Sequence, residues 1–192
     1  VASNIAAVSS ATSRYDGVLE IDELRTVVTE EIGANGKPVE VVIGRLAEMR
    51  IIEPKTKMML TNANIPYGSK LYFKNGDTVK KGDVICEWDP FNAVIVSEVA
   101  GKVEFNNVIE NVTYRVDSDE QTGLREKIII ESKDRTKAPE ANIVDANGQI
   151  IKTYALPVGA HLMVDEGAEL KVGEIFVKIP RATGSAGDIT GG

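Results

Sequence analysis

The sequence predicts an all-β protein of two tandem domains that arose by internal duplication, and three observations carry this prediction. The stretch Ile65–Pro90 recurs as Leu156–Arg181 at a constant offset of 91 residues without a gap. Apolar and polar residues alternate over short runs, as in half-buried β-strands. Asn-Gly and Gly-Asp pairs separate these runs and are typical of tight turns between strands. We therefore expect each copy to form one small barrel or sandwich.

The first copy takes up its β pattern at Gly17. The run GVLEIDELRTVVTEE leads into GANGKP, and because VEVVIGR follows, the Asn-Gly pair predicts a hairpin. The next stretch, RLAEMRIIEPKTKMML, predicts a second strand pair that bends near Pro54 and Lys55. NGDTVKKGD then predicts two tight turns around a very short strand.

The second copy restarts at Gly101 with the same order of segments. The counterparts are GKVEF for GVLEI, LREKIIIESK for KPVEVVIGR, and the stretch containing IVDANGQII for IIEPKTKMML. The duplication therefore covers most of the chain. We expect the first domain at residues 15–95 and the second at residues 96–181.

The two ends are rich in small residues, and neither has apolar side chains enough to anchor it. Residues 1–14 are mostly small and uncharged, and residues 182–192 include four glycines. Both stretches are expected to be flexible flanks, the first at most a frayed helix.

Three glycines recur at equivalent positions in both copies. A residue type that the backbone requires should recur in this way, whereas one that occurs by chance should not. The pairs are Gly68 with Gly159, Gly76 with Gly167, and Gly82 with Gly173. Because glycine adopts positive φ at little cost, we expect turns at these positions.

Alternation in KLYFK places Leu71 and Phe73 on one face and Tyr72 on the other, between two lysines. The second copy agrees, with Leu162 and Val164 inward and Met163 outward, flanked by His161 and Asp165. Tyr72 and Met163 thus occupy equivalent outward positions, and both are candidate contacts to a partner.

Composition excludes several classes of protein. With 29 acidic and 22 basic residues the net charge is −7, which argues against a phosphate-binding surface. The single cysteine excludes an internal disulfide and suits a reducing compartment. No apolar run approaches the roughly 20 residues of a membrane span. The first residues lack the basic region of a signal peptide, and no initiator Met is present, so we expect a longer parent chain.

No residue of the chain is a convincing catalytic, cofactor-binding or metal-binding group. His161, the only histidine, is expected to be solvated, because its counterpart is Lys70. Cys86 and Trp88 align with Val177 and Ile179, so we expect them to pack in or beside the core.

The polar run DSDEQTG superficially suggests a calcium loop. Thr122 stands where the sixth-position glycine belongs, and Ile128 stands where the bidentate glutamate belongs. We therefore expect no calcium site in this loop.

GDTVKKGDVICE together with SEVAGKV resembles a lipoyl/biotinyl carrier domain. A carrier presents one lysine at a hairpin tip, a few residues after the glutamate. After Glu87 this chain has Trp-Asp-Pro-Phe-Asn, and the second copy has Ile-Pro-Arg after Lys178. This resemblance implies the shape of a carrier without its modified lysine.

A second resemblance covers the whole chain. VASNIAAVSS, EWDPFNAVIVSEVAGKV, DEQTGL and KIPRATGSAGDITGG resemble the insertion within the trigger loop of the β′ subunit of bacterial DNA-directed RNA polymerase. It implies tandem sandwich-barrel hybrid domains. It also implies that the chain ends are tethers to the trigger helices, namely Val1, Ala2 and Ser3 on one side and Gly191 and Gly192 on the other.

The same resemblance implies a non-catalytic, cytoplasmic module of a nucleotidyltransferase, which modulates trigger-loop folding, nucleotide addition, pausing and transcript cleavage. The magnesium and zinc of the parent subunit lie elsewhere, so the fragment carries no cofactor. Expected partners are the other core subunits and transcription factors at the secondary channel, without sequence-specific nucleic-acid binding or a membrane. The alternative is a pair of carrier-like domains that acts as a protein-interaction scaffold.

Overall fold

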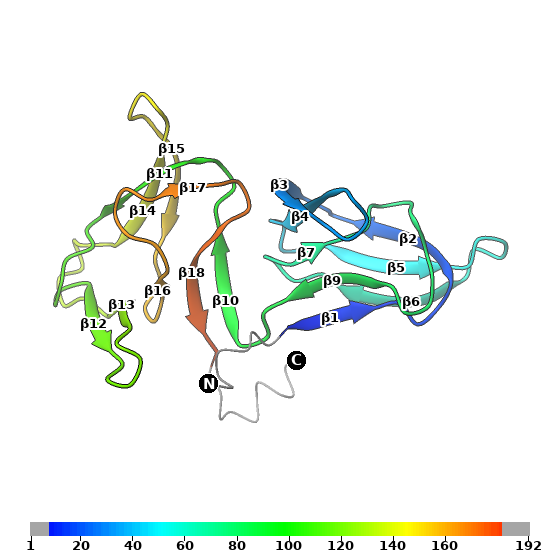
Figure 1. Ribbon diagram of the computed structural model, residues 1–192, viewed down its shortest axis with the longest axis horizontal. Helices are drawn as coiled ribbons and strands as arrows, with labels where there is room; N and C mark the ends of the chain where they lie inside the picture. The colour runs from blue at the N-terminus through cyan, green and yellow to red at the C-terminus, as the bar shows by residue number, and fades with distance from the viewer. Residues whose placement is uncertain (1–7, 182–192) are drawn as a thin grey trace. The chain divides into compact units, whose positions relative to one another are not determined.

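The computed structural model describes residues 8–181, and these residues form β-strands and turns without a helix. The chain divides into two compact units, Val1–Pro90 and Phe91–Gly192, each with two antiparallel sheets (Figure 1). The predicted all-β architecture of two tandem domains is therefore confirmed.

Unit 1 contains nine strands. A five-stranded sheet has the order β1-β9-β7-β4-β3, and a four-stranded sheet has the order β6-β5-β2-β8. The strands are β1 (Ser9–Thr12), β2 (Gly17–Asp22), β3 (Thr26–Ile32), β4 (Pro38–Val42), β5 (Glu48–Ile52), β6 (Met59–Asn64), β7 (Lys70–Leu71), β8 (Thr78–Val79) and β9 (Val84–Trp88).

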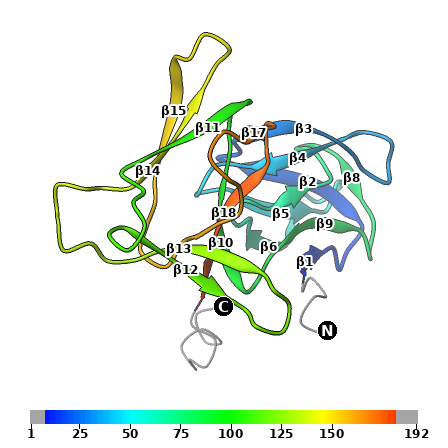
Figure 2. The ribbon, with the colours of Figure 1, turned by 60° about the vertical axis from the view of Figure 1, so that its left-hand side comes forward.

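Unit 2 repeats this topology. Its five-stranded sheet has the order β10-β18-β16-β13-β12, and its four-stranded sheet has the order β15-β14-β11-β17 (Figure 2). The strands are β10 (Asn92–Val96), β11 (Gly101–Asn106), β12 (Tyr114–Ser118), β13 (Arg125–Ile129), β14 (Glu140–Val144), β15 (Ile150–Ala155), β16 (His161–Leu162), β17 (Glu169–Leu170) and β18 (Ile175–Pro180).

Each strand of unit 1 has its counterpart nine strands later, and the pairing agrees residue by residue. Ala11 lies opposite Cys86 in β1–β9, and Ile95 lies opposite Val177 in β10–β18. Both ladders contain an irregularity one residue later. The internal duplication thus includes β1 and β10.

This equivalence corrects the predicted boundaries. Residues 9–12, predicted as part of a flexible flank, form β1 and pair with β9. Residues 92–95, predicted at the end of the first domain, belong to β10 and pair with β18. Both strands are paired with the last strand of their own unit, so the partner that decides their place lies about 80 residues further along the chain.

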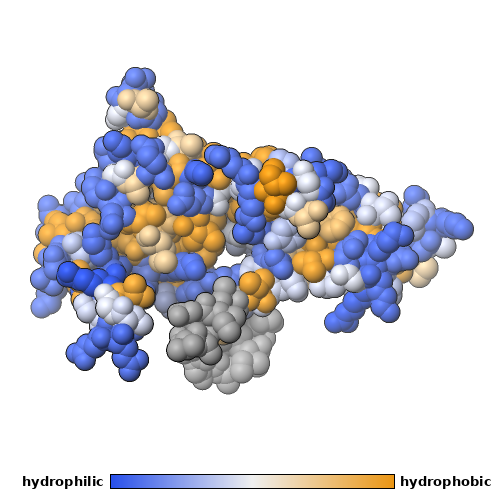
Figure 3. All heavy atoms as spheres, in the orientation of Figure 1, coloured by the Kyte–Doolittle hydropathy of each residue, from blue (hydrophilic) through white to orange (hydrophobic). Residues whose placement is uncertain are grey.

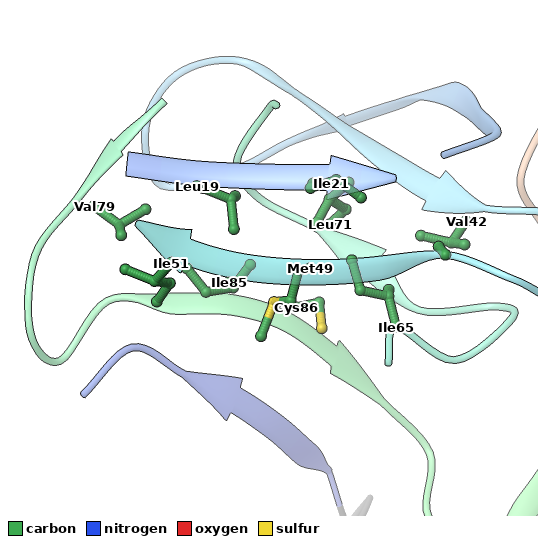
Figure 4. Packing of buried hydrophobic residues seen from close by; sticks show 11 residues of the cluster. Leu19, Ile21, Val42, Met49, Ile51, Ile65, Leu71, Val79, Ile85 and Cys86 are labelled. Atoms are coloured by element: carbon green, nitrogen blue, oxygen red, sulfur yellow. The ribbon is translucent and has the colours of Figure 1, made fainter. Parts of the chain in front are cut away.

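Each unit has its own hydrophobic core between its sheets. In unit 1 the core includes Leu19, Ile51 and Ile85, and Figure 4 shows these side chains directed into the space between the strands. In unit 2 the core includes Val103 and Phe176, which are fully buried. Since each core contains residues from both sheets of one unit, each unit has the apolar interior of a separate domain.

Close packing explains a glycine at the start of β2 and of β11. A Cβ on Gly17 would lie 2.7 Å from the carbonyl oxygen of Ile52, and one on Gly101 would lie 2.5 Å from that of Val144. The three recurring glycine pairs all have positive φ, for example 94° at Gly76 and 85° at Gly167, which confirms the predicted turns.

Candidate interaction residues and the chain ends

Tyr72 follows the short strand β7. Its backbone N–H donates to the carbonyl oxygen of Ile85 at 3.0 Å, which fixes its direction. Its hydroxyl donates to Glu87 Oε1 at 2.6 Å, and burial together with the Glu87 carboxylate raises the pKa of Tyr72. The ring is half-buried. The hydroxyl of this candidate contact is already bound within the chain, by Glu87.

Met163 follows β16 in the equivalent place. Its backbone N–H donates to the carbonyl oxygen of Phe176 at 2.9 Å, matching the bond of Tyr72. Its side chain is 49% exposed, so of the two candidate contacts Met163 presents the more open apolar surface. Leu71 and Leu162 are buried, which confirms the predicted alternation. Contact with a partner stays a prediction for both residues.

His161 faces outward but is less solvated than expected. Its side chain is 22% exposed, and its Nδ1 lies 3.2 Å from Glu126 Oε2 on the neighbouring strand β13. When protonated, the imidazole therefore forms an ion pair across two strands.

Cys86 and Trp88 lie where the repeat predicted them. Cys86 is fully buried, and Trp88 is half-buried against the core of unit 1. Burial raises the pKa of the Cys86 thiol to about 11, so the thiol stays protonated at neutral pH. Because the thiolate is the reactive form, Cys86 is a structural residue in the folded chain.

A pair of exposed apolar residues was not predicted from the sequence. Met59 on β6 and Ile150 on β15 are 55% and 58% exposed. They are 91 residues apart and follow equivalent turns, so recurrence of an apolar residue at that offset was the available signal. In Figure 3 apolar side chains form separate patches on a largely polar surface.

Within residues 8–181, no group of three or more His, Cys, Asp or Glu side chains is placed to hold a metal ion. The same part of the chain has no helix long and apolar enough to cross a membrane.

The two ends of the described chain leave from paired strands. In unit 1 the first residue of β1, Ser9, lies opposite the last residue of β9, Trp88. In unit 2 Asn92 lies opposite Pro180, and the N–H of Arg181 donates to the carbonyl oxygen of Phe91 at 2.9 Å. Each unit is therefore entered and left at one place.

This pairing limits the distance between the ends of the whole module. Opposite residues in an antiparallel pair are about 5 Å apart, and the four residue steps from Trp88 to Asn92 span at most about 14 Å. Ser9 and Pro180 thus lie within about 25 Å of each other. The limit rests on the pairings inside each unit and on the length of the connection, so it holds for any arrangement of the two units.

The first copy does not present a carrier hairpin after Glu87. β9 ends at Trp88, residues 89–91 connect the two units, and the next strand, β10, pairs with β18 rather than with β9. The segment that bears the modified lysine in a carrier is here a connection between domains.

Comparison with known proteins places the chain within a much longer one. It is 66% identical over its whole length to the DNA-directed RNA polymerase subunit β′ of Parabacteroides distasonis, 58% to that of Azobacteroides pseudotrichonymphae and 44% to that of Flavobacterium johnsoniae. The chain corresponds to a segment of bacterial RNA polymerase β′.

It spans 13–14% of the length of these β′ relatives. No protein-family model matches the segment. The proposed tethers Val1, Ala2, Ser3, Gly191 and Gly192 lie outside the described residues.

Proposed function

We propose that this β′ segment is a non-catalytic insertion in the trigger loop of bacterial RNA polymerase, where it modulates folding of that loop and hence nucleotide addition, pausing and transcript cleavage. The observation that carries the proposal is the limit of about 25 Å on the distance between Ser9 and Pro180, the first and last strand residues. A domain inserted into a continuous mobile element must be entered and left within a short distance, and the pairing of Ser9 with Trp88 and of Asn92 with Pro180 supports this.

The chemistry of the described residues supports a non-catalytic role. The one thiol is buried and protonated, and the Tyr72 hydroxyl is bound to Glu87. In this proposal the catalytic residues and the magnesium and zinc ions belong to other parts of the parent subunit. The partners are the other core subunits and factors at the secondary channel of a cytoplasmic polymerase.

The proposed mechanism is a bias on an equilibrium. A trigger loop is a lid that folds over the bound nucleotide and completes the site for phosphoryl transfer. A folded module attached to it changes the balance of open and closed states only through contacts that differ between them. A difference of about 1.4 kcal/mol changes that balance tenfold.

The test is a polymerase in which residues 9–181 are replaced by a flexible linker. Because Ser9 and Pro180 lie within about 25 Å of each other, a linker of about ten Gly/Ser residues is long enough to join the flanks without pulling them together. We expect RNA extension to persist, because the chemistry lies elsewhere, while pause lifetimes change several-fold. Loss of all bond formation, or pause and cleavage rates identical to those of the intact enzyme, would contradict the proposal.

The duplication offers a matched control. Because Asn92 and Pro180 are paired, unit 2 can be replaced alone by a short linker without separating the strands of unit 1. An intermediate effect on pausing indicates that both units contribute contacts, whereas the full effect assigns them to unit 2.

A further inference from the structure

The two ends of the module are held differently. β1, which continues from the N-terminal flank, is an edge strand and pairs only with β9. β18, which continues into the C-terminal flank, lies between β10 and β16 and is paired on both sides. Pulling on the N-terminal flank therefore loads one ladder, whereas pulling on the C-terminal flank loads two.

The duplication shows that the side chains of β1 hold it weakly. β10 is the equivalent edge strand of unit 2 and carries apolar, mostly β-branched residues where β1 carries small or hydroxyl residues. In order along the strands, the equivalent pairs are Ser9 and Ala93, Ser10 and Val94, Ala11 and Ile95, and Thr12 and Val96.

Burial follows this difference in side chains. Val96 is fully buried, whereas its counterpart Thr12 is exposed. Ala11 places a methyl group against the core at the position where β10 places the larger side chain of Ile95. β1 therefore buries much less apolar surface than an edge strand of this fold can bury.

Cys86 lies beside β1, on the neighbouring strand β9, and reports on the presence of β1. It is the cross-strand neighbour of Ala11, and a hydrogen bond joins the Ala11 backbone to the thiol. The thiol is fully buried and belongs to the only cysteine of the chain. Figure 4 shows Cys86 within the core cluster of unit 1. If β1 leaves the sheet, the Cys86 side chain loses its neighbour on that side.

We propose that β1 is a detachable strand, which leaves and rejoins the edge of its sheet while the remainder of unit 1 stays folded. Under the function proposed above, detachment lengthens the N-terminal tether, since freeing Ser9–Thr12 adds roughly 14 Å of extended chain. β18 stays fixed and acts as the anchor. The trigger loop then moves on a tether of variable length on one side and of constant length on the other.

The detachment is tested on the 192-residue chain by alkylation of Cys86 with N-ethylmaleimide, followed by mass spectrometry over a series of urea concentrations below the unfolding transition. Local opening exposes little surface, so we expect labelling to depend weakly on urea and to be at least about tenfold faster than global unfolding allows. Global unfolding is measured independently by circular dichroism, because Trp88 lies opposite Ser9 and its fluorescence responds to the opening itself. Labelling that shows the full urea dependence of global unfolding overturns the proposal.

Paired variants set the direction of the effect. The S10G/T12G variant weakens β1 and is expected to raise the labelling rate about tenfold. The S10V/T12V variant copies β10 and is expected to slow labelling several-fold, because valine favours strands. The V94G/V96G variant, which weakens β10 instead, is the control and leaves Cys86 labelling unchanged. Labelling that responds equally to all three variants contradicts a local opening at β1.

A disulfide that locks β1 to β9 tests this inference separately from the proposed function. A11C places a second thiol opposite Cys86, at a spacing that a disulfide can bridge. In the polymerase, the oxidised variant is expected to differ in pausing from the same variant reduced, with A11S as the redox-insensitive control. If replacing the module changes pausing but the lock does not, the detachable strand fails and the proposed function stands. If neither changes pausing, the proposed function fails.

Discussion

At the scale of single residues, the second copy acts as a control for the first. Position 86 holds a cysteine and position 177 a valine, and both side chains are fully buried. The core therefore accommodates a small apolar side chain at this position in both units. Cysteine differs from valine here in carrying a thiol that can ionise. A buried thiol makes the free energy of unfolding depend on pH.

The Cys86→Val variant tests this pH dependence. The folded pKa of about 11 lies above the ordinary value of 9.0, so the fold favours the protonated thiol. The contribution of the protonated thiol to the free energy of unfolding is complete below pH 9. It declines by about 2–3 kcal/mol as the pH rises toward 11. We expect the free energy of unfolding of the unmodified chain to fall by this amount relative to Cys86→Val, measured by urea denaturation at each pH.

The matched control is Val177→Cys in the Cys86→Val background. It moves the thiol to the equivalent site of unit 2 and is expected to transfer the decline to the unfolding of that unit. Parallel pH profiles for the unmodified chain and Cys86→Val would show that the thiol is not buried as described.

At the scale of strands and turns, the two units share an equivalent corner that a buried serine stabilises. The chain leaves β1 at Ser13 and β10 at Ser97, both buried. The Ser13 hydroxyl donates to the carbonyl oxygen of Tyr15, and the Ser97 hydroxyl donates to that of Val99, each at 2.6 Å. These bonds turn the chain from one sheet toward the other.

Ser13→Ala and Ser97→Ala are each expected to lower the free energy of unfolding of their own unit by about 1 kcal/mol, because each corner loses the hydrogen bond from its serine hydroxyl. Ser69→Ala is the control. The oxygen of Pro66 that accepts from its hydroxyl also accepts its backbone N–H, and the equivalent position is already Ala160. Urea denaturation measures all three variants, and equal losses would contradict this account of the corners.

At the scale of the whole molecule, two separate cores predict two unfolding events. Ile85 and Phe176 are equivalent, fully buried residues in the cores of unit 1 and unit 2. The only tryptophan, Trp88, packs against the core of unit 1, so its fluorescence reports that unit, whereas circular dichroism reports both.

We expect Ile85→Ala to destabilise unit 1 by about 2–4 kcal/mol and Phe176→Ala to destabilise unit 2 by about 3–5 kcal/mol. Ile85→Ala lowers the urea midpoint of Trp88 fluorescence, and Phe176→Ala leaves it unchanged while shifting part of the dichroism signal. A fluorescence midpoint that falls equally in both variants would show one cooperative unit instead.

Patterns in the amino-acid sequence were enough to predict the fold class, the duplication, the glycine turns and the inward positions of Leu71, Leu162 and Cys86. These follow from local rules, since strand alternation and the positive φ of a turn depend on neighbours along the chain. The resemblance to the trigger-loop insertion also came from the sequence, and comparison with the relatives supports it at the level of the β′ subunit.

The places of β1 and β10, in contrast, are set by pairing in the folded sheets. The letters of Ser9–Thr12 carry no alternating apolar pattern, and a strand without one is recognised only by its partner, here β9, far along the chain. The limit on the distance between Ser9 and Pro180 follows from the pairings in the two units. The contact of Cys86 with Ala11 and the contrast between an edge strand and a central strand at the two exits follow from them too. Long-range register is a property of the folded sheet, and no local pattern contains it.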